Sequence, residues 1–297
     1  MRIGHFDYNG RTFIGAIFSD QVFDLSYVAE NMEKDPLGDL TAVFTQGRFD
    51  NRLFHHLYML GQYREEHYYP LGLVEYVPLY KPGKIICLGL NYDEHAAETD
   101  RVAPEEPIYF LKASSSVIAH QQPIHYPDDL GRIDPEAELA VIIGKTASKV
   151  KKEDAPAFIA GYTILNDVTA RDLQTKDREK KYPWFRSKSI DTFCPMGPWI
   201  VTANEISPTE PLAIQLRVNN EIRQNSSTGL LIHNIPTLIE TISSLITLEP
   251  GDIISTGTPG GIAPVYPGDE VEVEVEKIGI LKNTVHGKKT PQEWPPG

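Results

Sequence analysis

Hydrophobic and polar residues alternate along much of this chain, which is the pattern of β-strands with one buried face. Such runs recur after residue 78, separated by Gly, Pro, Asn and Asp: KIICLGL, PIYFLK, ELAVIIG, AGYTIL, PWIVTA, AIQLRVN, DIISTG and EVEVEVEKIGIL. One clear helix is predicted over residues 236–248, with an apolar stripe of Leu238, Ile239, Ile242, Leu245 and Ile246. Many strands with few helices favour a β-rich α+β fold over a doubly wound α/β sheet.

The first 78 residues have the pattern of a small unit of their own. The runs RTFIGAIF and QVFDLS flank the turn Ser19-Asp20, which predicts a hairpin, and residues 50–66 carry apolar residues close to helical spacing. The segment PLYKPGK, with Pro78 and Pro82, then interrupts the regular patterns and is a reasonable junction between two units. We therefore predict a small N-terminal domain over residues 1–78 and a larger domain over residues 79–297.

Composition narrows the class of protein. The chain of 297 residues has no apolar stretch near the roughly 18 residues of a membrane span, and its first residues lack the apolar segment of a secretory signal. Cys87 and Cys194 are its only cysteines, too few for a disulfide framework, so we expect a cytoplasmic protein. The formal charge is −13 without a dense basic block, so we expect neither nucleic acid nor a membrane as a partner.

Two glutamates stand at the entrance of an apolar strand, in DPEAELAVIIG (134–144). Alternation puts Glu136 and Glu138 on one face, roughly 7 Å apart at about 3.3 Å per residue, and the same face continues with Ala140 and Ile142. Like charges at the edge of a core are unfavourable unless a positive charge lies between them. An exposed strand end is the alternative interpretation of this pair.

A third carboxylate favours a cation site. The apolar run AGYTILNDVTARD ends abruptly at Asn166 and Asp167, where an aspartate can also simply cap a turn. Two adjacent strands can bring Glu136, Glu138 and Asp167 together as three oxygen donors. Oxygen donors alone suit Mg²⁺, Mn²⁺ or Ca²⁺ better than Zn²⁺, which usually recruits His or Cys. We therefore predict a divalent cation between these carboxylates.

A second acidic run serves as a contrast. In DEVEVEVEK (269–277) the glutamates share one face of a strand and the valines fill the other. This pattern is typical of a half-buried strand with a solvated acidic face, and we predict no site there.

Three further segments carry candidate chemistry. His95 and Glu98 stand at i, i+3 just after the strand KIICLGL, where the carboxylate can orient the imidazole, although such a pair is more often simply exposed. Lys188 enters an apolar stretch, SIDTFCPMGP, so its amine can be held inside the protein. The Gly-rich turn STGTPGGIAP lacks the Walker lysine and a following helix, but its amides and the Thr258 hydroxyl can hold a carboxylate.

Together these segments resemble the fumarylacetoacetate hydrolase family. The matching stretches are GLNYDEHAAE, PEAELAVIIGK, GYTILNDVTARDLQ, SKSIDTFCPMGP and TGTPGGIAP, within about residues 81–285. The resemblance implies a mixed β-sandwich roll with a small N-terminal α/β domain, a homodimer, and action on 2-oxo acids with Mg²⁺ or Mn²⁺, or with Ca²⁺ in some members.

The resemblance also implies roles for particular residues. The metal ligands would be Glu136, Glu138 and Asp167; the catalytic residues His95, Glu98 and Lys188; and the substrate-contacting residues Arg171, Gln174 and Thr258. In this scheme the cation chelates a 2-oxo acid and stabilises its enolate, Lys188 adds positive charge, and the His95–Glu98 dyad activates a water molecule.

Three functions are compatible with these residues. The first, and the one we expect, is hydrolysis of a C–C bond in a 3-acylpyruvate-type 2,4-dioxo acid, which releases pyruvate. The second is a lyase or isomerase on the same scaffold, an oxaloacetate decarboxylase or a 2-oxo acid isomerase, because it would use the same enolate. The third is a catalytically silent binding module stabilised by the cation. The predicted dyad and Lys188 speak against this last function, because a structural ion needs none of them.

Overall fold

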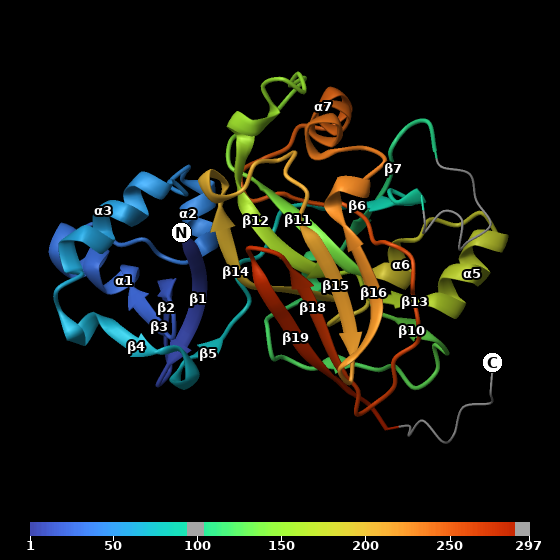
Figure 1. Ribbon diagram of the computed structural model, residues 1–297, viewed down its shortest axis with the longest axis horizontal. Helices are drawn as coiled ribbons and strands as arrows, with labels where there is room; N and C mark the ends of the chain where they lie inside the picture. The colour runs from blue at the N-terminus through green and yellow to red at the C-terminus, as the bar shows by residue number, and fades with distance from the viewer. Residues whose placement is uncertain (94–103, 289–297) are drawn as a thin grey trace.

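A computed structural model describes residues 1–93 and 104–288. Two β-sheets pack face to face in it, with an N-terminal lobe at one end and the helices α5 and α6 at the other (Figure 1). The described helices are α1 (Leu25–Val28), α2 (Leu40–Thr45), α3 (Asn51–Gly61), α5 (Arg171–Glu179), α6 (Phe185–Lys188) and α7 (Ile235–Leu245). The predicted strand-rich α+β class is confirmed.

The large sheet runs through the whole molecule. Its strands in spatial order are β4 (Tyr68–Pro70), β3 (Gln21–Asp24), β2 (Arg11–Phe18), β1 (Arg2–Tyr8), β14 (Cys194–Thr202), β12 (Ile159–Asn166), β11 (Ala137–Ile143), β17 (Ile253–Ser255), β6 (Ile85–Gly89) and β7 (Ile108–Lys112). Two short strands pair at its margins, β5 (Glu75–Tyr76) with β1 and β8 (Val117–Ile118) with β14. Most pairs are antiparallel, but β17 runs parallel to β6, so the sheet is mixed.

A smaller sheet covers one face of the large sheet. Its order is β16 (Glu221–Ser227), β15 (Ala213–Val218), β18 (Glu270–Val275), β19 (Gly279–His286) and β9 (Ile124–His125). A separate pair consists of β10 (Ile133–Asp134) and β13 (Thr169–Ala170). The acidic strand β18 is half-buried as predicted: its valines are buried, and its glutamates on the outer face pair with Arg217 and Lys282.

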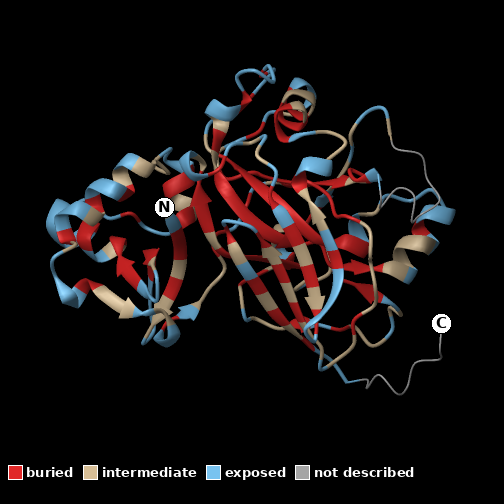
Figure 2. Cartoon of the chain, viewed as in Figure 1, coloured by how far each residue is buried: buried red, intermediate tan, exposed pale blue. Residues whose placement is uncertain are grey.

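Strand β11 is buried on both faces because it lies between two cores (Figure 2). Leu139 and Val141 belong to the core that the large sheet shares with the smaller one. Ala140 and Ile142 point to the other side, into a core that includes Ile3 of the N-terminal lobe. The alternation therefore places Glu136 and Glu138 on the face of the large sheet that is turned away from the smaller sheet.

The N-terminal lobe continues the large sheet. Strand β1 pairs with β14 through Ile3 opposite Ile200, and the two sides contribute to one hydrophobic core. The hairpin predicted at Ser19-Asp20 is present between β2 and β3, and α3 lies within the predicted helical segment 50–66. The boundary at residue 78 remains a prediction, since the lobe is joined to the rest by strand pairing as well as by the chain.

Helix α7 is shorter than its apolar stripe predicts. It begins at Ile235 and ends at Leu245, and Ile246 already has an extended backbone. Leu245, predicted to be in the stripe, is 77% exposed, whereas Leu238, Ile239 and Ile242 of the same stripe are buried. Among the described residues, none of the helices combines the length and the apolar character needed to cross a bilayer.

Candidate active site

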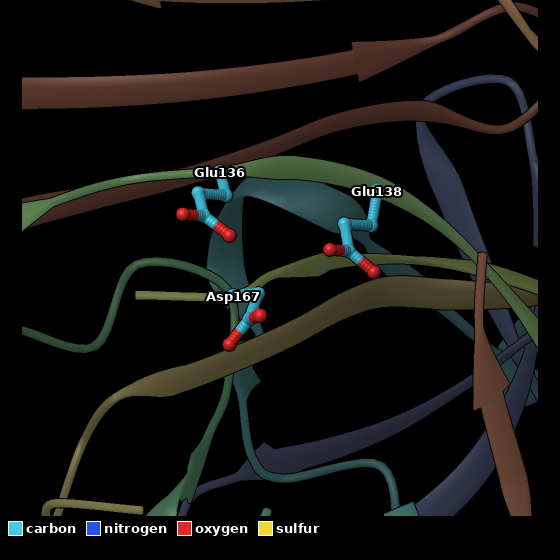
Figure 3. A group of neighbouring side chains, drawn as sticks. All are labelled: Glu136, Glu138 and Asp167. Carbon is cyan, nitrogen blue, oxygen red and sulfur yellow. The ribbon is translucent and has the colours of Figure 1, made fainter. Parts of the chain in front are cut away.

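The pairing of β11 with β12 brings the predicted metal ligands together. Ala137 lies opposite Asn166 in the ladder, so the beginning of β11 is beside the end of β12. The Asp167 N–H donates to the Glu136 carbonyl at 2.9 Å, and the Asn166 side chain accepts from the Glu136 N–H at 2.9 Å. One oxygen of each carboxylate of Glu136, Glu138 and Asp167 lies within 4.8 Å of the others, and all three residues are buried (Figure 3).

Lys188, the last residue of α6, joins two of these carboxylates. Its ammonium donates to Glu136 Oε2 at 2.8 Å and to Asp167 Oδ2 at 2.5 Å. Burial alone would lower the pKa of Lys188, but the charges of Asp167 and Glu136 outweigh burial and raise it above its ordinary value. Lys188 is therefore buried at the carboxylate cluster, as the apolar stretch after it suggested, and the two carboxylates favour its charged form.

Lys112, at the end of β7, is a second buried lysine that sequence reasoning missed. Its ammonium donates to Asp167 Oδ1 at 2.7 Å and to the Val168 carbonyl at 3.2 Å, and it also bonds the backbone carbonyl of Lys188. The available signal was a lysine that closes the apolar run PIYFLK, where a charged side chain normally marks the exit to solvent. Here the strand ends inside the protein, against the carboxylates.

Arg171 opens helix α5 and supports the cluster from a third side. Its guanidinium bonds Glu136, donates to Asp134 at 2.7 Å and donates to Gln174 Oε1 at 2.7 Å. Burial opposes its charge, but Glu136 and Asp134 raise the pKa of Arg171 above its ordinary value. Asp134, also missed from the sequence, is fully buried and accepts in addition from Arg132 at 2.7 Å. The predicted substrate contacts Arg171 and Gln174 are thus neighbours on one helix.

Glu138 has a different environment. The Ser255 hydroxyl and the Gly257 N–H, the latter at 3.0 Å, both donate to its Oε2 oxygen. No lysine or arginine of the described chain forms an ion pair with it. Burial raises the pKa of Glu138 well above its ordinary value, the nearby charges of Asp167 and Glu136 raise it further, and the hydrogen bond from Ser255 opposes them. Gly257 meets Glu138 with a backbone φ of +96°, a conformation that favours glycine.

The donor set fits a hard divalent cation. Three buried carboxylates offer oxygen ligands only, which is the chemistry of Mg²⁺, Mn²⁺ and Ca²⁺ sites. Lys112, Lys188 and Arg171 form ion pairs that balance the negative charges of Glu136 and Asp167. Glu138 accepts only hydrogen bonds from uncharged donors of the described chain. A cation beside Glu138 would favour its ionised form. The ligand roles predicted for these residues agree with this arrangement and remain predictions.

A pocket opens next to the cluster. Its polar lining includes Glu136, Lys188, Arg171, Gln174 and Thr258, so the predicted substrate-contacting residues share one cavity. Leu88, Phe110 and Trp184 contribute an apolar wall, with the Phe110 and Trp184 ring centres 5.5 Å apart. Thr258 and Lys188 thus face the same space from different segments of the chain.

Gln224 of β16 connects the Gly-rich turn to the strand of the carboxylates. Its side-chain amide donates to the Thr258 hydroxyl and to the Pro259 carbonyl, both at 2.8 Å, while its oxygen accepts from the Ala137 N–H at 2.9 Å. Gln224 could not be found from the sequence, because it stands in the largely polar run EIRQNSS, where nothing distinguishes it from its neighbours. The predicted dyad of His95 and Glu98 lies outside the described residues.

Comparison with known proteins matches most of the chain to a family model. Residues 84–286 match the family model described as fumarylacetoacetate (FAA) hydrolase C-terminal. An uncharacterized protein, MJ1656 of Methanocaldococcus jannaschii, is 52% identical over 205 residues, covering 69% of this chain and 84% of that protein. Oxaloacetate tautomerase YisK of Bacillus subtilis is 37% identical over 301 residues, covering 94% of this chain and 97% of YisK.

Solved structures extend the similarity to the fold. Maleylpyruvate hydrolase from Sphingobium sp. SYK-6, in complex with manganese (II) ion and pyruvate, superposes with a TM-score of 0.78 at 30% identity, covering 97% of this chain and 100% of that chain. A 5-carboxymethyl-2-hydroxymuconate delta-isomerase from Mycobacterium smegmatis gives a TM-score of 0.77 at 36% identity with the same coverages. Hydrolases and isomerases therefore share this fold.

Proposed function

The chain belongs to the fumarylacetoacetate hydrolase family, and we propose that it is a divalent-metal-dependent enzyme whose reaction is the keto–enol tautomerisation of oxaloacetate. The buried cluster of Glu136, Glu138 and Asp167 beside Lys188 supports enolate chemistry on a 2-oxo acid. The choice of reaction is carried by one observation: similarity to a protein named oxaloacetate tautomerase extends over 94% of this chain, the N-terminal lobe included.

The residues of the pocket have separate roles in this proposal. A divalent ion held by the three carboxylates would supply Lewis-acid polarisation of the 2-oxo acid. Lys188 lines the pocket with a charge that two carboxylates maintain, so it can stabilise negative charge on an enolate oxygen. Because the oxygen of Gln174 is directed to Arg171, its amide N–H groups are the part that can donate to a substrate oxygen.

Hydrolysis of a 3-acylpyruvate-type acid is the second candidate. Its support is the similarity to maleylpyruvate hydrolase with manganese and pyruvate, at 30% identity over 97% of this chain. Hydrolysis would need the same enolate and, in addition, a base that activates water, for which the sequence offers His95 and Glu98. Tautomerisation needs only proton transfer to and from carbon and oxygen.

The experiment follows both substrates on one enzyme preparation. Enol oxaloacetate is mixed with Mn²⁺-loaded protein, its conversion to the keto form is recorded by ultraviolet absorbance, and pyruvate release from oxaloacetate and from acetylpyruvate is measured in parallel. Mn²⁺ without protein and protein treated with EDTA are the controls, because free metal ions catalyse these reactions themselves. We expect metal-dependent tautomerisation that is faster than pyruvate release from either substrate. If pyruvate release from acetylpyruvate is faster than tautomerisation of oxaloacetate, the proposed tautomerase function is wrong and the hydrolase function takes its place.

A further inference from the structure

Helix α5 presents one complete face to the pocket. Arg171, Gln174, Thr175 and Arg178 all line the cavity, and their spacing of i, i+3, i+4 and i+7 places them in one stripe along the helix. The stripe begins at the carboxylate cluster, where Arg171 bonds Glu136, and continues outward to Arg178. The helix is therefore a wall along which an extended substrate can lie.

The two arginines of this wall are in different states. The Arg171 guanidinium already bonds Asp134, Glu136 and Gln174. The Lys188 ammonium likewise bonds the carboxylates of Glu136 and Asp167. Arg178 is exposed, and its guanidinium makes no ion pair with any residue that the structure describes. Among the described residues that line the pocket, Arg178 is thus the cation that is available to an anionic ligand.

Arg178 is within reach of a ligand held at the cluster. Seven residues separate it from Arg171, which corresponds to about 10 Å along the helix axis. Helical side chains lean toward the N-terminus of their helix, so the long side chain of Arg178 is directed back toward Arg171 and the cluster. The guanidinium is therefore directed along the cavity wall toward a ligand whose 2-oxo acid end is held at the cluster.

We propose that Arg178 is a specificity-determining residue that binds a second carboxylate of the substrate, distal to the 2-oxo acid group. The inference rests on the proposed function, because it takes the 2-oxo acid end to be held at the cluster. A guanidinium offers two parallel N–H donors to a carboxylate, whereas Trp184 and Ile262, which also line the cavity, offer apolar contact. The site would accordingly prefer dicarboxylic 2-oxo acids to those with an uncharged tail.

The test compares two unreactive ligands that share the 2-oxo acid end. Calorimetric titration of the Mn²⁺-loaded protein gives the Kd for pyruvate, which has no distal carboxylate, and for 2-oxoglutarate, which has one. Arg178→Gln should weaken 2-oxoglutarate about tenfold, the size of one charge-assisted pair at a partly exposed position, and leave pyruvate within a factor of about two. Arg178→Lys should recover part of the loss. Lys176→Gln, on the same helix but outside the pocket lining, removes the same charge and should change neither Kd by more than about twofold.

Each other outcome overturns the inference. An equal loss for both ligands would make Arg178 a general electrostatic or structural residue, and a loss below about twofold for 2-oxoglutarate would leave it without a role in binding. A Lys176→Gln effect as large as that of Arg178→Gln would mean that net charge, and not this side chain, attracts the dianion. If the Mn²⁺-loaded parent binds neither ligand, the proposed function fails together with the inference.

Discussion

Lys112 and Lys188 bond opposite oxygens of the same carboxylate, that of Asp167. Lys112 takes Oδ1 at 2.7 Å and Lys188 takes Oδ2 at 2.5 Å, and Lys112 also holds the backbone carbonyl of Lys188. Lys188 lines the pocket, whereas Lys112 does not. The two lysines therefore have different surroundings at Asp167: Lys112 is enclosed by backbone carbonyls, whereas Lys188 faces the pocket, where we propose that its charge acts on the substrate.

Lys112→Met should destabilise the fold. The variant removes a buried ammonium and leaves two backbone carbonyls, those of Val168 and Lys188, without this donor. We expect the free energy of unfolding in urea to fall by about 3 kcal/mol, as when one partner of a buried ion pair is removed. Lys152→Met, at an exposed position, is the control and should change it by less than about 0.5 kcal/mol. Equal stabilities of the two variants would show that Lys112 does not hold the cluster together.

Lys188→Met should affect turnover far more than metal binding. In this variant Glu136 still has its ion pair with Arg171, and Asp167 still has its ion pair with Lys112. Neither carboxylate is therefore left without a positive partner. Turnover should fall by roughly 10²–10³, by analogy with the loss of one oxyanion donor. The affinity for Mn²⁺ should be equal to or higher than that of the parent, because a neighbouring positive charge is gone. Turnover within a factor of about three of the parent would make Lys188 a packing residue.

A histidine that does not line the pocket should make stability depend on pH. His120 Nδ1 accepts from the Lys282 N–H at 3.0 Å, which requires the neutral ring, and burial together with the charge of Lys282 lowers the pKa of His120 to about 4. The unfolded chain binds this proton already near pH 6.5, so the stabilisation is present above that pH and is lost as the pH falls toward 4.

The measurement is the free energy of unfolding at pH 7 and at pH 5 for the parent and for His120→Gln. Glutamine can accept the same hydrogen bond without titrating. We expect the parent to lose more stability than the variant over this interval, by on the order of 1 kcal/mol. Parallel losses would mean that His120 takes up its proton in the folded protein as readily as in the unfolded chain.

The carboxylate cluster was accessible from the sequence because its signals are local. Period-2 alternation places Glu136 and Glu138 on one face, and the apolar run before Asp167 ends where the ladder with β11 ends. Antiparallel pairing of neighbouring strands then brings a strand beginning and a strand end together. The solvated acidic face of β18 was recognisable for a similar reason, since its alternation with valine is unbroken.

The supporting residues were not accessible because their partners are distant in sequence. The hydrogen bond from Lys112 to Asp167 joins residues that are 55 positions apart in the sequence, and the one between Ala137 and Gln224 joins residues that are 87 positions apart. Helix α5 was also missed: its sequence RDLQTKDRE is almost wholly polar, so no apolar periodicity marks it. The helix is defined by its buried ion pairs and by the pocket that it lines, both of which exist only in the assembled fold.

The most direct test of the central claim is a calorimetric titration of metal-free protein with Mn²⁺, for the parent, Glu138→Gln and Glu274→Gln. Glu274 is the matched control, a glutamate on the solvated face of β18. We predict one Mn²⁺ bound by the parent and by Glu274→Gln with the same affinity, and an affinity lower by about 100-fold or more for Glu138→Gln. The metal-free Glu138→Gln protein should be as stable as the parent, because the buried Glu138 carboxylate has no cationic partner to lose. Undiminished Mn²⁺ affinity in Glu138→Gln would contradict the assignment of this cluster as the metal site.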